Sequence, residues 1–105
     1  MNAKEEFLEV ARGRSVICAS ISNGGYYSDD GERRSINLKK GHSQEDYDKF
    51  KSAINFSYNS VYGRQELRGM IWFNDGTWAE RVEYNGTEWW EYREVPQIPN
   101  ELQNS

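Results

Sequence analysis

The sequence predicts one α+β domain, built on a mostly antiparallel sheet of five or six strands with two helices packed on one face. Three observations support this fold class. The chain has 105 residues, a length that fits a single domain. Its last third contains three β-prone runs separated by short turns rich in asparagine and glycine, as in an antiparallel meander. Its first half contains two stretches with the apolar spacing of amphipathic helices.

The first helix and the first strand are predicted near the N-terminus. Residues 2–12 form the helix, because Asn2 begins a capping box and Gly13 stands where a glycine often ends a helix. The apolar, β-branched run over residues 16–21 predicts a largely buried strand. We expect Cys18 to be a small core residue of that strand.

A second strand and a second helix follow a polar loop. Residues 35–38 are predicted as the strand, and a capping box that begins at Ser43 starts a helix over residues 43–54. After this helix the apolar period changes from helical to alternating. Phe56 and Tyr58 therefore indicate an extended segment or a further strand.

Residues 66–95 carry the strongest signal, a three-stranded meander rich in tryptophan. Its strands are the runs 66–73, 77–84 and 87–95. Proline cannot donate a backbone hydrogen bond to a sheet, so Pro96 and Pro99 are expected to end it. The remaining residues, 100–105, are polar and are predicted to be a flexible tail.

The Asn85-Gly86 turn sets the register of the second hairpin in this meander. Asparagine followed by glycine is typical of a two-residue type I′ turn, in which both residues need a positive φ. The turn places Arg81 opposite Trp90, close enough for a cation–π contact. It also places two like-charged pairs across the hairpin, Glu80 with Glu91 and Glu83 with Glu88.

If the first hairpin has a two-residue turn centred on Asp75-Gly76, Trp72 lies opposite Ala79 and large rings occupy both faces of the sheet. One face then carries Ile71, Phe73, Trp78, Val82 and Trp89, and the other carries Met70, Trp72, Trp90 and Tyr92. The helices can cover one face. The other is either buried, by curling of the sheet or packing of further strands, or is a surface for a partner. The candidate partner-binding residues are Trp72, Arg81, Trp90 and Tyr92.

Composition and charge narrow the function classes. Thirteen Lys and Arg against 17 Asp and Glu give a net charge of −4, without the concentrated basic surface of a general nucleic-acid binder. One cysteine and one histidine are too few for the usual zinc sites, and no metal or cofactor is predicted. The sequence has no apolar run long enough to span a membrane and no signal-peptide pattern, so we expect a cytoplasmic protein.

The sequence lacks a convincing catalytic set, so we predict a protein that is not an enzyme. The only histidine, His42, lies in a Gly-His-Ser turn where solvent exposure is expected, and the only cysteine lies inside a predicted strand. Glu80 opposite Glu91, beside aromatic residues, resembles the carboxylate pair of a hydrolase. A solvated sheet face bridged by arginine explains the same pair more simply. Carboxylate-based hydrolysis is therefore the least favoured alternative.

Acidic residues also cluster in the first half of the chain. The cluster comprises Asp29, Asp30, Glu32, Glu45, Asp46 and Asp48. Most such clusters are solvated surfaces, and the first three residues lie in a run typical of a turn rather than of a calcium loop. The same charges could imitate the phosphates of DNA. An acidic DNA mimic or nucleic-acid-directed accessory protein is therefore the second hypothesis.

Three segments of the meander and its continuation form a signature: Ile71–Trp78, Glu83–Tyr92 and Pro96–Pro99, with Tyr62–Leu67 before them. This signature resembles the C-terminal part of small uncharacterised proteins of tailed bacteriophages and prophages. The resemblance implies no catalytic residues. It implies a compact accessory protein that binds a host or phage macromolecule, for example an inhibitor of a host enzyme or defence system.

Our leading hypothesis is therefore a small accessory protein that binds a host or phage protein through its second aromatic face. The same face could instead join two copies of the chain as a homodimer. Binding to a membrane is not expected. Binding to nucleic acid is disfavoured, because every ring lies near a glutamate that repels phosphate.

Overall fold

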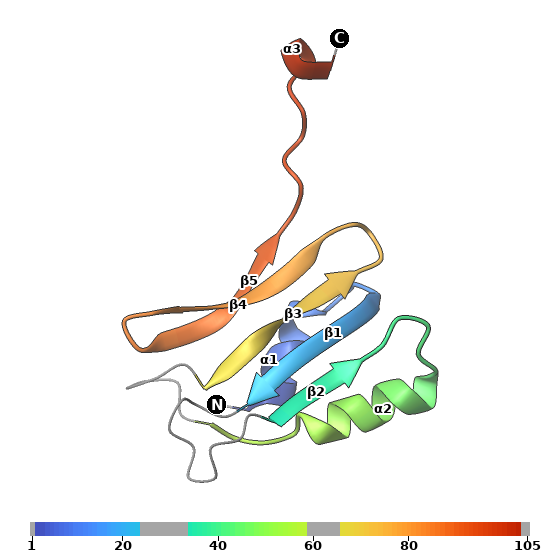
Figure 1. The fold of residues 1–105 in the computed structure, drawn as a ribbon, viewed down its shortest axis with the longest axis vertical. Coiled ribbons are helices and arrows are strands. Elements are labelled where there is room, and N and C mark those ends of the chain that lie inside the picture. Colours follow the sequence, from blue (N-terminus) through green and yellow to red (C-terminus); the bar gives the residue numbers. More distant parts are fainter. Residues whose placement is uncertain (1, 24–33, 59–65, 104–105) are drawn as a thin grey trace.

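The computed structural model describes residues 2–23, 34–58 and 66–103, which form a five-stranded antiparallel sheet and three helices (Figure 1). The predicted α+β class and the C-terminal meander are confirmed. Across the sheet the strand order is β2-β1-β3-β4-β5. In chain order the elements are α1 (Ala3–Val10), β1 (Val16–Asn23), β2 (Arg34–Leu38), α2 (Gln44–Ala53), β3 (Leu67–Phe73), β4 (Trp78–Tyr84), β5 (Thr87–Arg93) and α3 (Asn100–Gln103).

The two longer helices begin at side-chain caps, as predicted. The Asn2 side chain accepts a hydrogen bond from the backbone N–H of Glu5 at 3.0 Å, which satisfies one of the unpaired donors at the start of α1. At α2 the capping box is complete, since Ser43 and Asp46 each accept a hydrogen bond from the other's backbone N–H. The segment after α2 makes only an isolated bridge, between Ser57 and Asn2, rather than a further strand among the described residues.

The second hairpin has the predicted turn and register. Asn85 and Gly86 have φ values of 52° and 82°, as a type I′ turn requires. Across this turn Arg81 lies opposite Trp90, and the other pairs of β4 and β5 follow in the same register. A two-residue turn matches the twist of the strands it joins, so the local sequence was sufficient to define this hairpin.

The first hairpin differs from the prediction by one residue. Trp72 lies opposite Trp78, not opposite Ala79, because the loop contains three residues, 74–76, rather than two. The N–H of Phe73 donates to the carbonyl oxygen of Thr77 at 3.0 Å and closes the loop. Gly76, at φ 88°, supplies the left-handed residue that ends a three-residue hairpin loop.

This shift changes which side chains share a face, because successive residues of a strand point to opposite sides. Ile71 lies opposite Ala79, and both are fully buried on the face that the helices cover. Trp72 and Trp78 both lie on the other face. The predicted grouping of Trp72 with Trp90 and Tyr92 is therefore wrong.

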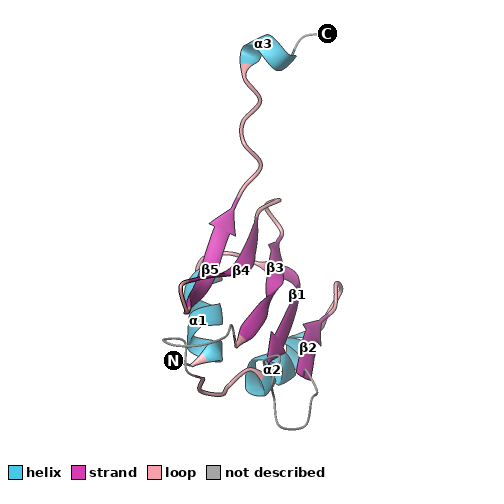
Figure 2. Cartoon of the chain, turned by 60° about the vertical axis from the view of Figure 1, so that its left-hand side comes forward, coloured by secondary structure: helices cyan, strands magenta, loops and turns pink. Residues whose placement is uncertain are grey.

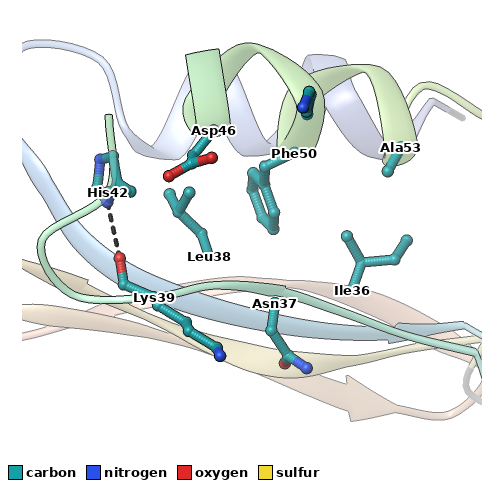
Figure 3. Close-up of a pocket in the computed structure, with 9 residues that line it drawn as sticks. Ile36, Asn37, Leu38, Lys39, His42, Asp46, Phe50 and Ala53 are labelled. Atoms are coloured by element: carbon teal, nitrogen blue, oxygen red, sulfur yellow. Dashed lines mark hydrogen bonds between the residues drawn. The ribbon is translucent and has the colours of Figure 1, made fainter. Parts of the chain in front are cut away.

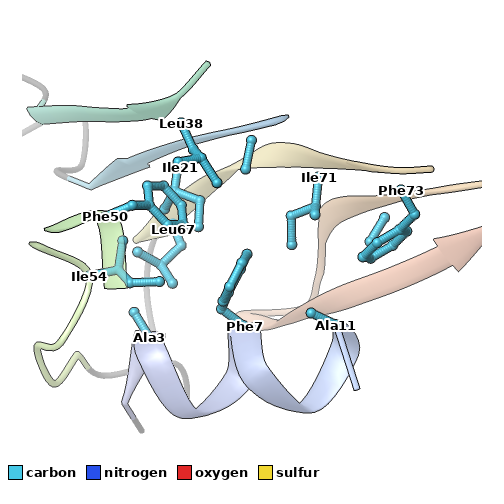
Figure 4. Close-up of a cluster of buried hydrophobic side chains, with 12 residues drawn as sticks. Ala3, Phe7, Ala11, Ile21, Leu38, Phe50, Ile54, Leu67, Ile71 and Phe73 are labelled. Atoms are coloured by element: carbon cyan, nitrogen blue, oxygen red, sulfur yellow. The ribbon is translucent and has the colours of Figure 1, made fainter. Parts of the chain in front are cut away.

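The core lies between the sheet and the two helices α1 and α2, which pack on the same face (Figures 2 and 4). Phe7 of α1 is fully buried, and its ring lies 5.3 Å from that of Phe50 of α2 in an edge-to-face arrangement. Burying a side chain of this size stabilises the fold by roughly 1.5–3 kcal/mol. The buried apolar residues are Ala3, Phe7, Ala11, Ala19, Ile21, Leu38, Phe50, Ile54, Leu67, Ile71, Phe73 and Ala79.

After β5 the chain leaves the sheet and extends away from it (Figures 1 and 2). Residues 100–103, predicted as part of a flexible tail, form one helical turn, in which the N–H of Leu102 donates to the carbonyl of Pro99 at 2.9 Å. Residues 104–105 lie outside the described part. None of the described helices has the length and apolar character needed to cross a membrane.

Candidate functional site

The most conspicuous surface is the sheet face opposite the helices, which carries three of the four tryptophans. We call it the indole face and define it by Met70, Trp72, Trp78, Glu80, Val82, Trp89, Glu91 and Arg93. No helix or strand among the described residues packs on it (Figures 1 and 2). Trp72 and Trp89 keep 39% and 38% of their surface exposed, so two indoles are available to another molecule.

The register places these side chains in rows that cross the strands. Trp72 of β3 lies beside Trp78 of β4, which lies beside Arg93 of β5. Two residues further along, Met70, Glu80 and Glu91 form the next row, and Val82 pairs with Trp89 beyond it. From the spacing of strands and residues, the three indoles span a patch of about 10 by 14 Å.

The charged residues in the middle of the indole face are held by neighbours on the same face. The Nε of Arg93 donates to Glu80 at 2.8 Å, and the indole N–H of Trp89 donates to Glu91 at 2.7 Å. Glu80 and Glu91 lie opposite one another, and Arg93 forms an ion pair with Glu80. These three groups together carry one net negative charge, in the centre of an otherwise apolar surface.

Of the four predicted partner-binding residues, only Trp72 lies on the indole face. Arg81, Trp90 and Tyr92 occupy alternate positions that point to the helix-covered side. Tyr92 remains 38% exposed at the edge of that side, where the guanidinium of Arg14 lies 4.0 Å from the centre of its ring. The structure therefore divides the predicted set between the two faces, and sequence reasoning missed that Trp78 and Trp89 share a face with Trp72.

Arg81 has a structural position, because its side chain is completely buried between the sheet and α1. It donates to Glu88 at 2.9 and 3.1 Å and to Glu6 at 3.0 Å, and it also contacts the hydroxyl of Tyr58. The predicted cation–π contact with Trp90 is present, at 5.5 Å from guanidinium to ring. A buried charge needs such partners, so Arg81 joins the meander to the first helix.

Glu88 is the second buried charge of this network, and no local pattern in the sequence indicates its role. Besides Arg81 it accepts hydrogen bonds from the backbone N–H groups of Glu66 and Leu67, at 2.6 and 3.0 Å. It thereby satisfies two backbone donors at the start of β3. The like-charged pair of Glu83 and Glu88 is tolerated because Glu83 is exposed while Glu88 is neutralised from the helix-covered side.

The acidic cluster is only partly described. Asp29, Asp30 and Glu32 lie outside the described residues. The three acidic residues on α2 are exposed, and each has a local partner: Glu45 pairs with Lys49, Asp48 pairs with Lys51, and Asp46 caps the helix. The charges of Glu45 and Asp48 are therefore offset by lysines of the same helix, and the carboxylate of Asp46 is engaged by the backbone at the helix start.

The remaining candidate residues, Cys18 and His42, lie in different parts of the fold. Cys18, expected in the core, is half-buried on the other side of β1, where it lies opposite Trp72. His42 is half-buried, and its Nδ1 lies 3.0 Å from the carbonyl oxygen of Lys39. Among the described residues no group of three or more His, Cys, Asp or Glu is placed to hold a metal ion.

Comparisons of the chain with protein-family models, with curated proteins and with solved structures gave no match. The geometry and chemistry of the indole face are therefore the grounds for assigning a function to this chain.

Proposed function

We propose that this protein is a non-enzymatic binding module that holds a partner protein on its indole face. One observation supports the proposal above all others. Three of the four tryptophans lie together on a sheet face that no described element covers. Tryptophan is enriched at the centres of protein interfaces, and large uncovered apolar surfaces are uncommon on monomers.

The chemistry of the indole face suggests what the partner presents. Its rows of indoles favour apolar or aromatic side chains, and the faces of the rings also attract cations. The excess negative charge between Glu80 and Glu91 favours a basic side chain at the centre of the contact. We infer a protein surface with a lysine or arginine surrounded by apolar residues.

The resemblance of the last third to tailed-phage proteins suggests where such a partner is found. We propose a bacterial host protein, or a phage protein, whose activity is blocked when the indole face covers it. The competing proposals have less support. Two of the three α2 acids pair with lysines of the same helix, and Glu80 and Glu91 are engaged by Arg93 and by the indole of Trp89 on the same sheet face.

The test compares quantitative affinity capture from phage-infected and uninfected bacterial lysates by the wild type and by two variants, Trp72→Ala and Trp89→Ala. A captured protein is then purified and its dissociation constant measured with each variant. We expect each substitution to weaken binding at least about 30-fold, the effect of losing an interface hot spot. The matched control is Leu8→Ala, because Leu8 has a similar exposed fraction, 41%, but lies on α1.

Several outcomes would count against this function. A partner that binds the wild type and both folded tryptophan variants equally well uses another surface. Failure to capture any saturable partner from either lysate would also contradict the proposal. Sedimentation of the purified chain as a dimer that Trp72→Ala dissociates would assign the indole face to a second copy instead.

A further inference from the structure

A second candidate site lies on the opposite side of the molecule from β5, in a groove between the edge strand β2 and helix α2 (Figure 3). Its volume is about 370 Å³, within the range of small ligand-binding clefts. The lining residues are Ile36, Asn37, Leu38, Lys39, His42, Asp46, Lys49, Phe50 and Ala53. None of these belongs to the indole face.

The strand side of the groove is the edge of β2 rather than one of its faces. Four consecutive residues, 36–39, line the groove. Since alternate side chains point to opposite faces, a cavity over one face would meet only every second residue. In Figure 3, Ile36 and Leu38 point toward α2 while Asn37 and Lys39 point away from it. The groove therefore follows the backbone of the edge.

In the described part of the chain β2 pairs only with β1, on its inner side. An edge strand leaves every second N–H and C=O without a strand partner, and an extended peptide can pair with those groups as an added strand. The groove is thus placed where such a peptide would lie.

The helix side of the groove has the right shape for the side chains of that peptide. Asp46, Lys49, Phe50 and Ala53 follow one stripe of α2 at spacings of three and four residues. This stripe is about 10 Å long, the length of three extended residues. Phe50 is buried at its base, whereas Ala53 is exposed and contributes only a methyl group to the lining.

The charges along the groove favour an acidic ligand, although the whole chain has a net charge of −4. Lys49 on α2 and Lys39, whose side chain lies on the side of the strand edge away from α2, place two positive charges beside this edge against one lining carboxylate, Asp46. That carboxylate is already engaged, because it accepts the backbone N–H of Ser43. The ion pair between Lys49 and Glu45 is 3.4 Å long and solvent-exposed. Exchanging Glu45 for an acidic side chain of a ligand would therefore cost little free energy.

We propose that this groove binds an extended segment of a partner protein that carries an acidic side chain and adds as a sixth strand to the edge of β2. The backbone of the segment pairs with β2, and alternate apolar side chains fill the space between Ile36, Phe50 and Ala53. An aspartate or glutamate of the segment lies near Lys39 or Lys49. This site is independent of the indole face and does not rest on the function proposed for it.

The test begins with selection from a library of random seven-residue peptides, displayed between flexible linkers so that neither terminus is free, on the immobilised full chain. We expect enriched sequences with β-branched or aromatic residues at alternate positions and at least one aspartate or glutamate. The most enriched peptide is synthesised with capped ends and titrated into isotope-labelled protein. Amide signals of residues 36–39 and 46–53 should shift, and those of Trp72 and Trp89 should not.

Paired variants distinguish binding at this groove from a non-specific effect of the protein's net charge. Lys39→Glu should weaken the peptide at least about fivefold, because it replaces an attraction by a repulsion. Lys40→Glu, an exposed neighbour that does not line the groove, should change binding less than twofold. Ala53→Trp should fill the groove and abolish binding, and Trp72→Ala should leave binding unchanged.

Methylation of alternate backbone nitrogens in the peptide tests the added strand itself. Methyl groups on the nitrogens that face β2 should abolish binding, whereas the other alternate set should be tolerated. The proposal is overturned if no sequence is enriched, if the enriched peptides shift the indole face, or if Lys39→Glu and Lys40→Glu act equally. Stronger binding by a peptide of residues 94–105 than by any selected peptide would assign the groove to a second copy of this chain and also overturn it.

Discussion

Replacing Arg81 with methionine should remove a large part of the stability of this fold. Methionine keeps the length and the apolar stem of the side chain but removes four hydrogen bonds: two to Glu88, one to Glu6 and one to the hydroxyl of Tyr58. The side chain of Glu88 is 1% exposed and would be left as a buried carboxylate without its counter-charge. Removing one partner of a buried ion pair typically costs about 3–5 kcal/mol.

The structure places the expected loss near the lower end of that range. Glu88 keeps the backbone N–H groups of Glu66 and Leu67 as donors. Glu6 is 18% exposed and can be solvated again. We therefore expect Arg81→Met to lower the free energy of unfolding by about 3 kcal/mol, a fifth or more of the ~5–15 kcal/mol of an ordinary domain.

The assay is urea unfolding, followed by circular dichroism and tryptophan fluorescence and extrapolated to water. The matched control is Arg93→Met, which breaks an arginine–glutamate pair on the same sheet whose side chains are 43% and 40% exposed. That substitution should cost less than about 1 kcal/mol. Adding Glu88→Gln to Arg81→Met should recover about 1 kcal/mol, because it removes the uncompensated charge. Equal losses for the two arginine variants, or no recovery in the double variant, would refute the reasoning.

Three further substitutions test other parts of the fold. Gly69→Ala should destabilise it by more than about 3 kcal/mol in the same assay, because Gly69 has a φ of 153° and a Cβ there would overlap the backbone oxygen of Ser20; full stability would mean that β1 and β3 do not approach so closely. Phe7→Ala should cost about 3–5 kcal/mol, whereas its exposed neighbour Leu8→Ala should cost less than about 0.5 kcal/mol, and similar values would place Phe7 outside the core. The hydrogen bond from the backbone N–H of Ser43 holds the pKa of Asp46 below its usual value, so Asp46 stabilises the folded state above the unfolded pKa and loses this effect as the pH falls through the lowered one. Asp46→Asn should therefore lower the melting temperature at pH 7 but not well below pH 4, and a difference that persists in acid would contradict this role.

The features that the sequence predicted correctly are those that depend on neighbouring residues. The caps at Asn2 and Ser43 each involve a side chain and a backbone N–H three residues later. The Asn85-Gly86 turn likewise fixes a register within seven residues on either side. Such features are visible in a single sequence, because the interacting groups are close along the chain.

The first hairpin could not be assigned in the same way, because the run 74–76 suits loops of two or of three residues. A two-residue loop uses Asp75-Gly76, whereas a three-residue loop uses all three residues with the glycine last. The loop length depends on which side chains of β3 pack into the core. The strands and helices that form this core are far away in the sequence. Because the loop is one residue longer than predicted, Trp72 shares a face with Trp78 and Trp89 rather than with Trp90 and Tyr92.

Strand β3 on its own contains the information needed to place Trp72. Leu67, Ile71 and Phe73 share one side, whereas Trp72 shares the other with Arg68, which is exposed. A charged residue on the Trp72 side indicates that this side faces solvent. The pattern of β3 therefore argues for the indole face that the structure has.

The pattern of strand β4 predicts the opposite orientation of the sheet. Arg81 alternates with Trp78 and Val82, so the usual rule places Arg81 in solvent and the two apolar residues in the core. The structure reverses this arrangement: Arg81 is buried with Glu88, and Trp78 and Val82 lie on the indole face. The buried ion pair and the uncovered indoles are thus two consequences of one register. Since the helix-covered side of β4 is occupied by a charge network, its large apolar side chains remain on the side where a partner can reach them.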